Sequence, residues 1–244
     1  MRQLKRVVRQ LASSLSYEID RKMAPASLEG IKLALAYYSK AKPGFSLVQV
    51  GACDGVAGDP VFEFITREQI HAILVEPIET SFLKLKKSYT DLPNVEFLQA
   101  AIAEEDGVST IYKVKESGRW ANSEWAPQWA SFNRQHLIKQ GVKSDEIEEV
   151  TVPCMTLDSL MAKFNLDQID FLQVDTEGYD AVVVEMALNL PTVPDFINFE
   201  NLHVKQKPKI SERLFRKLSE AGYTWIHDQY NTLAVHNRLT SLWK

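Results

Sequence analysis

Strand-forming segments alternate with segments of helical periodicity along most of the chain. Five apolar runs are predicted to be strands, because they are short and rich in β-branched or aromatic residues. They are SLVQV (46–50), HAILVEP (71–77), NVEFLQAAI (94–102), IDFLQVD (169–175) and PDFINFE (194–200). Strands that alternate with helices predict a largely parallel sheet covered by helices on both faces.

The segments between these strands carry signals for helix ends and for added strands. Pro60 opens a helix predicted over 60–69, and SFLKLKKSY (81–89) forms the next one. Thr156 suits the N-cap of a helix that follows a short strand, and Gly222 ends a helix over 211–222. VSTIYKV (108–114) is predicted to add a strand, and GYTWIHD and NTLAVHN to close the chain as an antiparallel pair.

Residues 1–44 are predicted to form a helical extension, and residues 45–244 one domain with an insert at about 115–150. Within the extension, apolar residues from Leu28 to Tyr38 recur at helical spacing. The first twenty residues, MRQLKRVVRQLASSLSYEID, predict a basic amphipathic helix. Such a helix either docks on the domain or on a second subunit, or contacts an anionic membrane or acts as a transit peptide.

Composition narrows the classes of function. The chain of 244 residues has 28 basic and 32 acidic residues, a net charge of −4, which argues against a general nucleic-acid binder. Its two cysteines, Cys53 and Cys154, form no metal or disulfide pattern and fit small buried residues in a reducing, cytoplasmic compartment. No apolar run reaches the length of about 20 residues that a membrane span needs.

Acidic residues follow four of the five predicted strands. Asp54 follows the first strand in the loop GACDG, and Glu76, Asp175 and Glu200 end the second, fourth and fifth. Parallel strands end at one edge of a sheet, which is where such folds bind ligands. The sequence therefore predicts an acidic, ligand-binding edge.

The loop after the first strand limits the kind of ligand. GACDGV has Cys53 and Val56 where a dinucleotide-binding G-x-G-x-x-G motif has glycines. A pyrophosphate needs that close approach, so nicotinamide and flavin cofactors are disfavoured. A nucleoside with positive charge, such as S-adenosylmethionine, suits an acidic edge better.

Six segments in order resemble the FkbM-type methyltransferases. They are LVQVGACDG, ILVEP, QAAIAEEDG, PCMTLDSL, IDFLQVDTEGYD and DFINFENLH, within about residues 45–236. The resemblance implies a Rossmann-like class I methyltransferase fold, with a mostly parallel, seven-stranded sheet whose last strand is antiparallel. It also implies S-adenosyl-L-methionine as cofactor.

By position, the resemblance implies roles for individual residues. Glu76 would bind the ribose hydroxyls and the loop at Gly51 the methionine part, with backbone near Ala101 facing the adenine. The complete predicted cofactor set is Gly51, Ala52, Asp54, Gly55, Glu76, Pro77, Ala100, Ala101, Ile102 and Asp175.

Asp175 and Glu177 are expected at the centre of the chemistry, with Glu200 and His203 as further candidates for catalysis. Methyl transfer needs an aligned acceptor and removal of its proton. Either a side chain accepts that proton directly, or Asp175 with Glu200 and Asn201 holds a divalent ion such as Mg²⁺. The sequence leaves both open.

The segment 118–141 interrupts the alternation of strands and helices and is rich in tryptophan. Long insertions at a ligand-binding edge are commonly binding loops, although its aromatic residues equally suit packing on the sheet or on a dimer partner. Its candidates for acceptor binding, together with Asn201, are Trp125, Trp129, Ser131 and His136.

The leading hypothesis is an O-methyltransferase that uses S-adenosylmethionine to modify a hydroxyl of a sugar, glycan or secondary metabolite. Its partner would be a small-molecule or carbohydrate acceptor, with a homodimer as an open alternative. Two rivals are a non-catalytic, nucleoside-binding scaffold of the same fold and an NAD(P)-dependent oxidoreductase.

Overall fold

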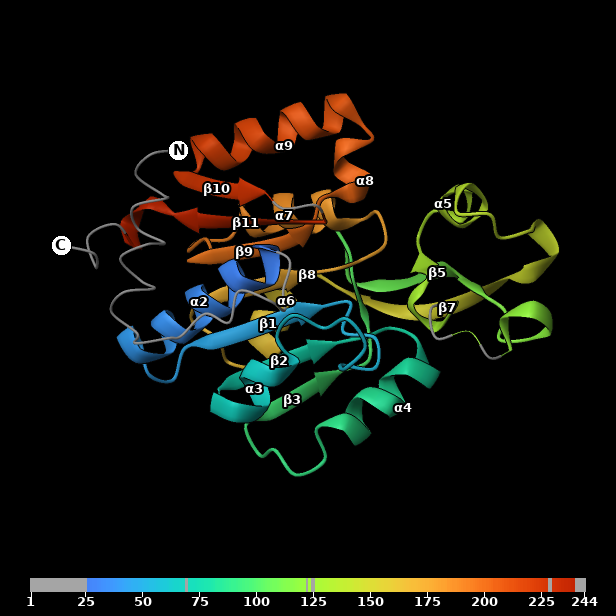
Figure 1. Ribbon diagram of the computed structural model, residues 1–244, viewed down its shortest axis with the longest axis horizontal. Helices are drawn as coiled ribbons and strands as arrows, with labels where there is room; N and C mark the ends of the chain where they lie inside the picture. Colours follow the sequence, from blue (N-terminus) through green and yellow to red (C-terminus); the bar gives the residue numbers. More distant parts are fainter. Residues whose placement is uncertain (1–25, 69, 122, 124–125, 228–229, 240–244) are drawn as a thin grey trace.

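The computed structural model describes residues 26–68, 70–121, 123, 126–227 and 230–239, and is built around a central sheet (Figure 1). This sheet has seven strands in the order β10-β11-β9-β8-β1-β2-β3. The strands from β9 to β3 in that order are parallel, while β11 is antiparallel to both of its neighbours. Their bounds are β1 Ser46–Val50, β2 His71–Val75, β3 Val95–Leu98, β8 Phe171–Val174, β9 Phe196–Glu200, β10 Tyr223–His227 and β11 Asn231–His236. This confirms the predicted fold class.

Successive side chains of each central strand point to opposite faces of the sheet, and most of them are apolar on both faces. Helices therefore cover both faces. In β1, Leu47 packs with the first set of helices and Val48 with the second. The first set is α2 Ala26–Ala41, α3 Phe62–Glu68 and α4 Glu79–Ser88. The second set is α6 Leu157–Lys163, α7 Asp180–Ala187 and α9 Pro208–Glu220, and the short helix α8 Leu202–Lys205 precedes α9.

Helix α2 is part of the domain core. Leu35 is fully buried, and the hydroxyl of Tyr38 donates to the carboxylate of Asp195 beneath the sheet. The predicted basic helix at 1–20 lies outside the described residues. Among the helices that are described, none is both long and apolar enough to span a membrane.

The third predicted strand is wrong in its extent. β3 ends at Leu98, and Ala101–Ile102 form β4, which pairs with β7 Ile147–Met155 in a second sheet of order β4-β7-β5-β6. Ala100 and Ala101 are buried, as Val95 and Leu98 are in β3. No glycine or proline between these residues marks the point where the chain changes partner.

Residues 107–155 form an extension that we call the arm. Strand β5 Gly107–Val114 pairs antiparallel with β7 along its whole length. Between them lie three 3₁₀ turns, β6 Ala130–Ser131 and helix α5 Arg134–Lys139; the turns are Gly118–Trp120, Ala126–Gln128 and Ser144–Glu146. The arm projects beyond one end of the central sheet (Figure 1). It has a small core of its own, which includes Leu137 and Ile147.

Leu35→Ala should destabilise the whole domain, because α2 packs into the main core. Loss of a fully buried leucine costs about 2–5 kcal/mol in free energy of unfolding, which urea denaturation measures. Lys40→Ala, on the exposed side of the same helix, should change it by about 0.5 kcal/mol or less. Equal effects of the two substitutions would show that α2 is not part of the cooperative core.

Candidate active site

A cavity opens at the edge where the parallel strands end. Its empty volume, with the open mouth included, is about 910 Å³. The ends of β1, β2 and β8, the start of β4 and strand β6 of the arm contribute its walls. Ten of the predicted site residues line it: Gly51, Ala52, Glu76, Pro77, Ala100, Ala101, Ile102, Ser131, Asp175 and Glu177. The structure thus brings together residues that are up to 126 positions apart, from Gly51 to Glu177.

Gly51 allows the first loop to lie against the backbone after β8. Its φ is +82°, and a Cβ atom at this position would lie 1.7 Å from the carbonyl oxygen of Asp175. No residue with a side chain fits that contact. The glycine therefore sets the distance between two walls of the cavity.

Glu76 both closes the first loop and faces the cavity. Its two carboxylate oxygens accept hydrogen bonds from the backbone N–H groups of Cys53, at 2.9 Å, and Ile78, at 2.8 Å. The side chain is 6% exposed. Burial raises the pKa of Glu76 to about 7, although the two hydrogen bonds oppose this shift.

Two predicted cofactor residues serve the loop instead of the cavity wall. Asp54 accepts hydrogen bonds from the N–H groups of Val56 and Ala57 in a local turn. At Gly55, a Cβ atom would lie 2.6 Å from side-chain atoms of Leu85 and Tyr89, so this glycine permits helix α4 to pack on the loop. Neither residue lines the cavity.

Asp175 stands inside the cavity at the end of β8. By accessible surface Asp175 is exposed, and it lines the cavity. The protein around the cavity displaces much of the bulk water near the carboxylate, and this desolvation, followed by repulsion from Asp180, Glu177 and Asp59, raises the pKa of Asp175 above its ordinary value. Among the described residues, no side chain or backbone group donates a hydrogen bond to its carboxylate.

Glu177 occupies a strained turn and contacts two histidines. Its φ is +49°, which is uncommon for a residue other than glycine. Its Oε2 lies 3.1 Å from Nε2 of His136 and 3.6 Å from Nε2 of His203. Burial acts to raise the pKa of Glu177, but hydrogen bonds from the two histidines outweigh it and lower this pKa to about 2.

Asp180 and Glu200 complete the acidic edge behind the cavity. Asp180 is fully buried and accepts hydrogen bonds from the N–H groups of Thr176 and Gly178, which holds the turn after β8 in place. Burial, with repulsion from Asp175, Asp180 and Glu177, raises the pKa of Glu200 to about 9. Glu200 is therefore protonated at neutral pH.

The predicted magnesium ligands are only partly assembled. Asp175 and Glu200 lie together with Asp180, with one carboxylate oxygen of each within 4.8 Å of the others. Asn201 is instead buried below the edge, where its amide donates to Thr232 Oγ1 and to the carbonyl of Asn231. The geometry gives Asn201 a structural role.

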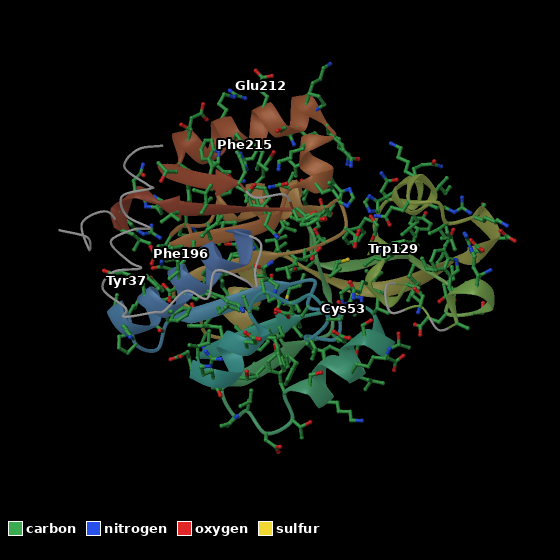
Figure 2. The ribbon with its side chains drawn as sticks, in the orientation of Figure 1. Tyr37, Cys53, Trp129, Phe196, Glu212 and Phe215 are labelled. Carbon is green, nitrogen blue, oxygen red and sulfur yellow. The ribbon has the colours of Figure 1, made fainter. Side chains whose placement is uncertain are left out.

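The predicted acceptor residues divide between the cavity and the core of the arm. The hydroxyl of Ser131 donates to the carbonyl of Glu177 at 2.8 Å, which ties β6 to the cavity wall. Trp129 packs edge-on against Trp120, with ring centroids 5.6 Å apart, within the arm (Figure 2). His136 contacts Glu177 behind the cavity, and Trp125 lies outside the described residues.

Several cavity residues escaped the sequence-based prediction. Asp59 accepts from Gln49 Nε2 at 2.8 Å and from the N–H groups that begin α3, and burial raises its pKa to about 6. Its position just before Pro60 was a usable signal, because aspartate is a preferred N-cap. Gln128 and Phe132, which come from the arm, had no comparable signal.

The family model of the methyltransferase FkbM domain matches residues 49–224. A comparison with curated proteins gave no match. Among solved structures, SAH-bound methyltransferase PaMTH1 of Podospora anserina is 7% identical, with 97% of this chain and 96% of that chain covered and a TM-score of 0.43. Fibrillarin of Aeropyrum pernix with natively bound S-adenosyl-L-methionine is 12% identical, with 84% and 74% covered and a TM-score of 0.42. Similarity this distant says nothing of substrate or chemistry.

Gly51→Ala should lower the stability of the fold far more than Gly44→Ala, where the new side chain has a positive φ but no collision. Gly44 has φ +77° with nothing within 4 Å of an added Cβ, so Gly44→Ala should cost about 1–2 kcal/mol in stability. Gly51→Ala adds the collision with the backbone at Asp175 and should cost more than about 4 kcal/mol. Chemical denaturation of both variants measures the difference, and similar losses would refute the close contact.

Proposed function

The chain belongs to the FkbM methyltransferase family, whose domain spans residues 49–224, and we propose that it methylates a hydroxyl oxygen of a sugar or secondary metabolite with S-adenosylmethionine as cofactor. The observation that carries this proposal is the single cavity wall shared by Gly51, Glu76 and Asp175. Each of the three matches a part of such a cofactor. The backbone loop at Gly51 suits the methionine part, and the buried carboxylate of Glu76 suits the ribose. The acidic group of Asp175 suits the positively charged end that carries the methyl group.

The residues of the cavity fit the cofactor in charge and shape. When ionised, the Glu76 carboxylate has an acceptor site left on each oxygen, since each accepts only one backbone N–H group. Two such sites suit the two hydroxyls of a ribose. The apolar wall at Ala101 and Ile102 suits a purine ring. The uncompensated charge of Asp175 favours a ligand with positive charge.

The acceptor is proposed to enter between Asp175 and the arm. Ser131, Gln128 and Phe132 line this side of the cavity, and the Phe132 ring lies 4.8 Å from that of Tyr179. Polar groups beside an aromatic face suit a sugar ring or a polyhydroxylated metabolite. The arm thus contributes binding surface without supplying the reacting groups.

When bound, S-adenosylmethionine supplies a methyl group on a positively charged sulfur. Asp175 is the best candidate for the base, because it lines the cavity and its carboxylate accepts no hydrogen bond from the described residues. Glu177 is a weak base with its pKa at about 2. Glu200 is a poorer candidate, because it does not line the cavity and its Oε2 lies 3.3 Å from Nε2 of His203.

Calorimetry with S-adenosylhomocysteine and transfer of labelled methyl groups test this proposal together. Binding of S-adenosylhomocysteine supports the cofactor assignment, and labelled product from a panel of sugars and polyhydroxylated metabolites supports the reaction. Binding without transfer to any hydroxyl acceptor would favour a nucleoside-binding scaffold, and absence of binding would remove the cofactor.

Glu76→Ala should weaken binding of S-adenosylhomocysteine by about 1–3 kcal/mol, because hydrogen bonds to a charged group are lost. The same substitution also frees the N–H of Cys53, so the loop could contribute to the effect. The 2′-deoxy analogue of the ligand separates the two causes. If Glu76 binds the ribose, the substitution should cost less with the analogue than with the parent ligand. An equal cost with both would place the effect in the loop.

Asp175→Asn should lower turnover by at least about 100-fold, since the amide cannot accept the acceptor's proton. Affinity for S-adenosylhomocysteine should remain unchanged, because this ligand carries no positive charge on sulfur. Single-turnover methyl transfer and calorimetry measure the two quantities. Full turnover in the variant would exclude Asp175 as the base.

A further inference from the structure

Four side chains from three separate parts of the chain converge behind Glu177. His136 and Gln140 belong to the arm and lie four residues apart at α5, on the same side of the helix. Glu177 follows β8 and His203 follows β9. One ligand atom each from His136, Glu177 and His203 lies within 4.8 Å of the other two. All three side chains are largely buried, with 10%, 18% and 11% of their surface exposed.

Hydrogen bonding alone does not satisfy this cluster. His136 Nε2 lies 3.1 Å from Glu177 Oε2 and 2.9 Å from the amide nitrogen of Gln140. If Nε2 carries a proton, it donates to Glu177 and then faces another donor in Gln140. If it carries none, it accepts from Gln140 and then faces Glu177 as a second acceptor. The single oxygen of the Gln140 amide is buried without a hydrogen-bond partner.

A cation at the centre resolves this conflict. With the Gln140 amide rotated by 180°, its oxygen would lie where its nitrogen is, 2.9 Å from His136 Nε2 and 3.3 Å from Glu177 Oε2. Four lone pairs would then point into one space. Bonds of about 2.0–2.2 Å in a tetrahedral zinc site set ligand atoms about 3.3–3.6 Å apart. The distances of 3.1 and 3.6 Å from Glu177 to the two histidines bracket that spacing.

We propose that His136, Glu177 and His203, with the amide oxygen of Gln140, bind one divalent transition-metal ion that fastens the arm to the edge of the central sheet. Two imidazoles and one carboxylate favour Zn²⁺ over Mg²⁺ or Ca²⁺, which prefer oxygen ligands. This site uses none of the residues of the predicted one at Asp175, Glu200 and Asn201, although Glu200 is its neighbour, with Oε2 3.3 Å from Nε2 of His203. It does not depend on the proposed methyl transfer, because metal binding is measured directly.

The surrounding backbone is shaped for this contact. A Cβ atom at Gly178 would lie 3.1 Å from Nδ1 of His136, so the glycine lets the imidazole approach the turn after β8. The rings of His136 and His203 lie edge to face with centroids 4.2 Å apart. The strained backbone of Glu177 aims its side chain at both rings. An ion here would join α5, β8 and α8 at one point.

The test uses the full chain, purified without a histidine tag, stripped with a chelator and titrated with ZnCl₂ or MgCl₂ by calorimetry. We expect one Zn²⁺ per chain and no Mg²⁺ at this site. His136→Ala, His203→Ala and Glu177→Gln should each lower the Zn²⁺ affinity by at least about 100-fold. His71→Ala is the matched control, because His71 also pairs with a glutamate, Glu96, at 2.9 Å but without further ligands. Its affinity should equal that of the wild type.

Failure of the wild-type chain to bind Zn²⁺, or wild-type affinity in the cluster variants, would overturn the proposal. Glu177→Gln keeps the side-chain volume, and Co²⁺ absorption in the visible range reports a four-coordinate site directly, so misfolding of one alanine variant leaves the test decisive. Hydrogen exchange in α5 should slow when Zn²⁺ is added to the wild type but not to His136→Ala; unchanged exchange would refute the fastening role. Calorimetry with S-adenosylhomocysteine on the same stripped samples keeps failure of the metal site distinct from failure of the proposed cofactor site.

Discussion

The site depends on the cost of placing several carboxylates at one edge of a sheet, where protein replaces water. Each carboxylate needs compensation for lost hydration. Asp180 obtains it from backbone N–H groups of the turn after β8, and Glu76 from those beside its own loop. Glu177 obtains it from histidines. Asp175, which also lines the cavity, has no such donor among the described residues. The carboxylate without compensation therefore lies where a positively charged ligand would bind.

Backbone geometry makes this arrangement of charge attainable. The loop after β1 and the turn after β8 approach one another so closely at Gly51 that no Cβ atom fits. The turn itself passes through left-handed conformations at Glu177 and Gly178, with φ of +49° and +95°. Strain of this kind costs of order 1–3 kcal/mol at a residue such as Glu177. Hydrogen bonds from the N–H groups of Thr176 and Gly178 to Asp180, and contacts with the arm, hold the turn in place against that cost.

Most of the fold followed from the pattern of apolar residues, because a strand buried on both faces is recognisable from its own residues. The order of elements and the acidic edge at Glu76 and Asp175 were predictable for that reason. The change of partner between β3 and β4 was not, since neither glycine nor proline marks a break between the two pieces. The contact of His136 with Glu177 was also not predictable, because the two residues are 41 positions apart and meet only when the arm packs against the turn after β8. Asp54 shows the opposite error: a strand-end position predicted a ligand contact, while local turn geometry claims its carboxylate.

The arm meets the cavity at the turn after β8, where Glu177 contacts the arm and also lines the cavity, beside Gln128, Ser131 and Phe132 of the arm. Glu177 lines the cavity with one part of its surface and meets the histidines with its Oε2. Its backbone carbonyl accepts the hydrogen bond from Ser131, which ties β6 to the turn after β8. Asp175 lies two residues before Glu177 on the same turn. The contacts that compensate the charge of Glu177 therefore also hold the turn that carries Asp175, the proposed base, against the part of the arm that lines the cavity. In this fold, the position of Asp175 depends on residues behind the cavity as well as on those that line it.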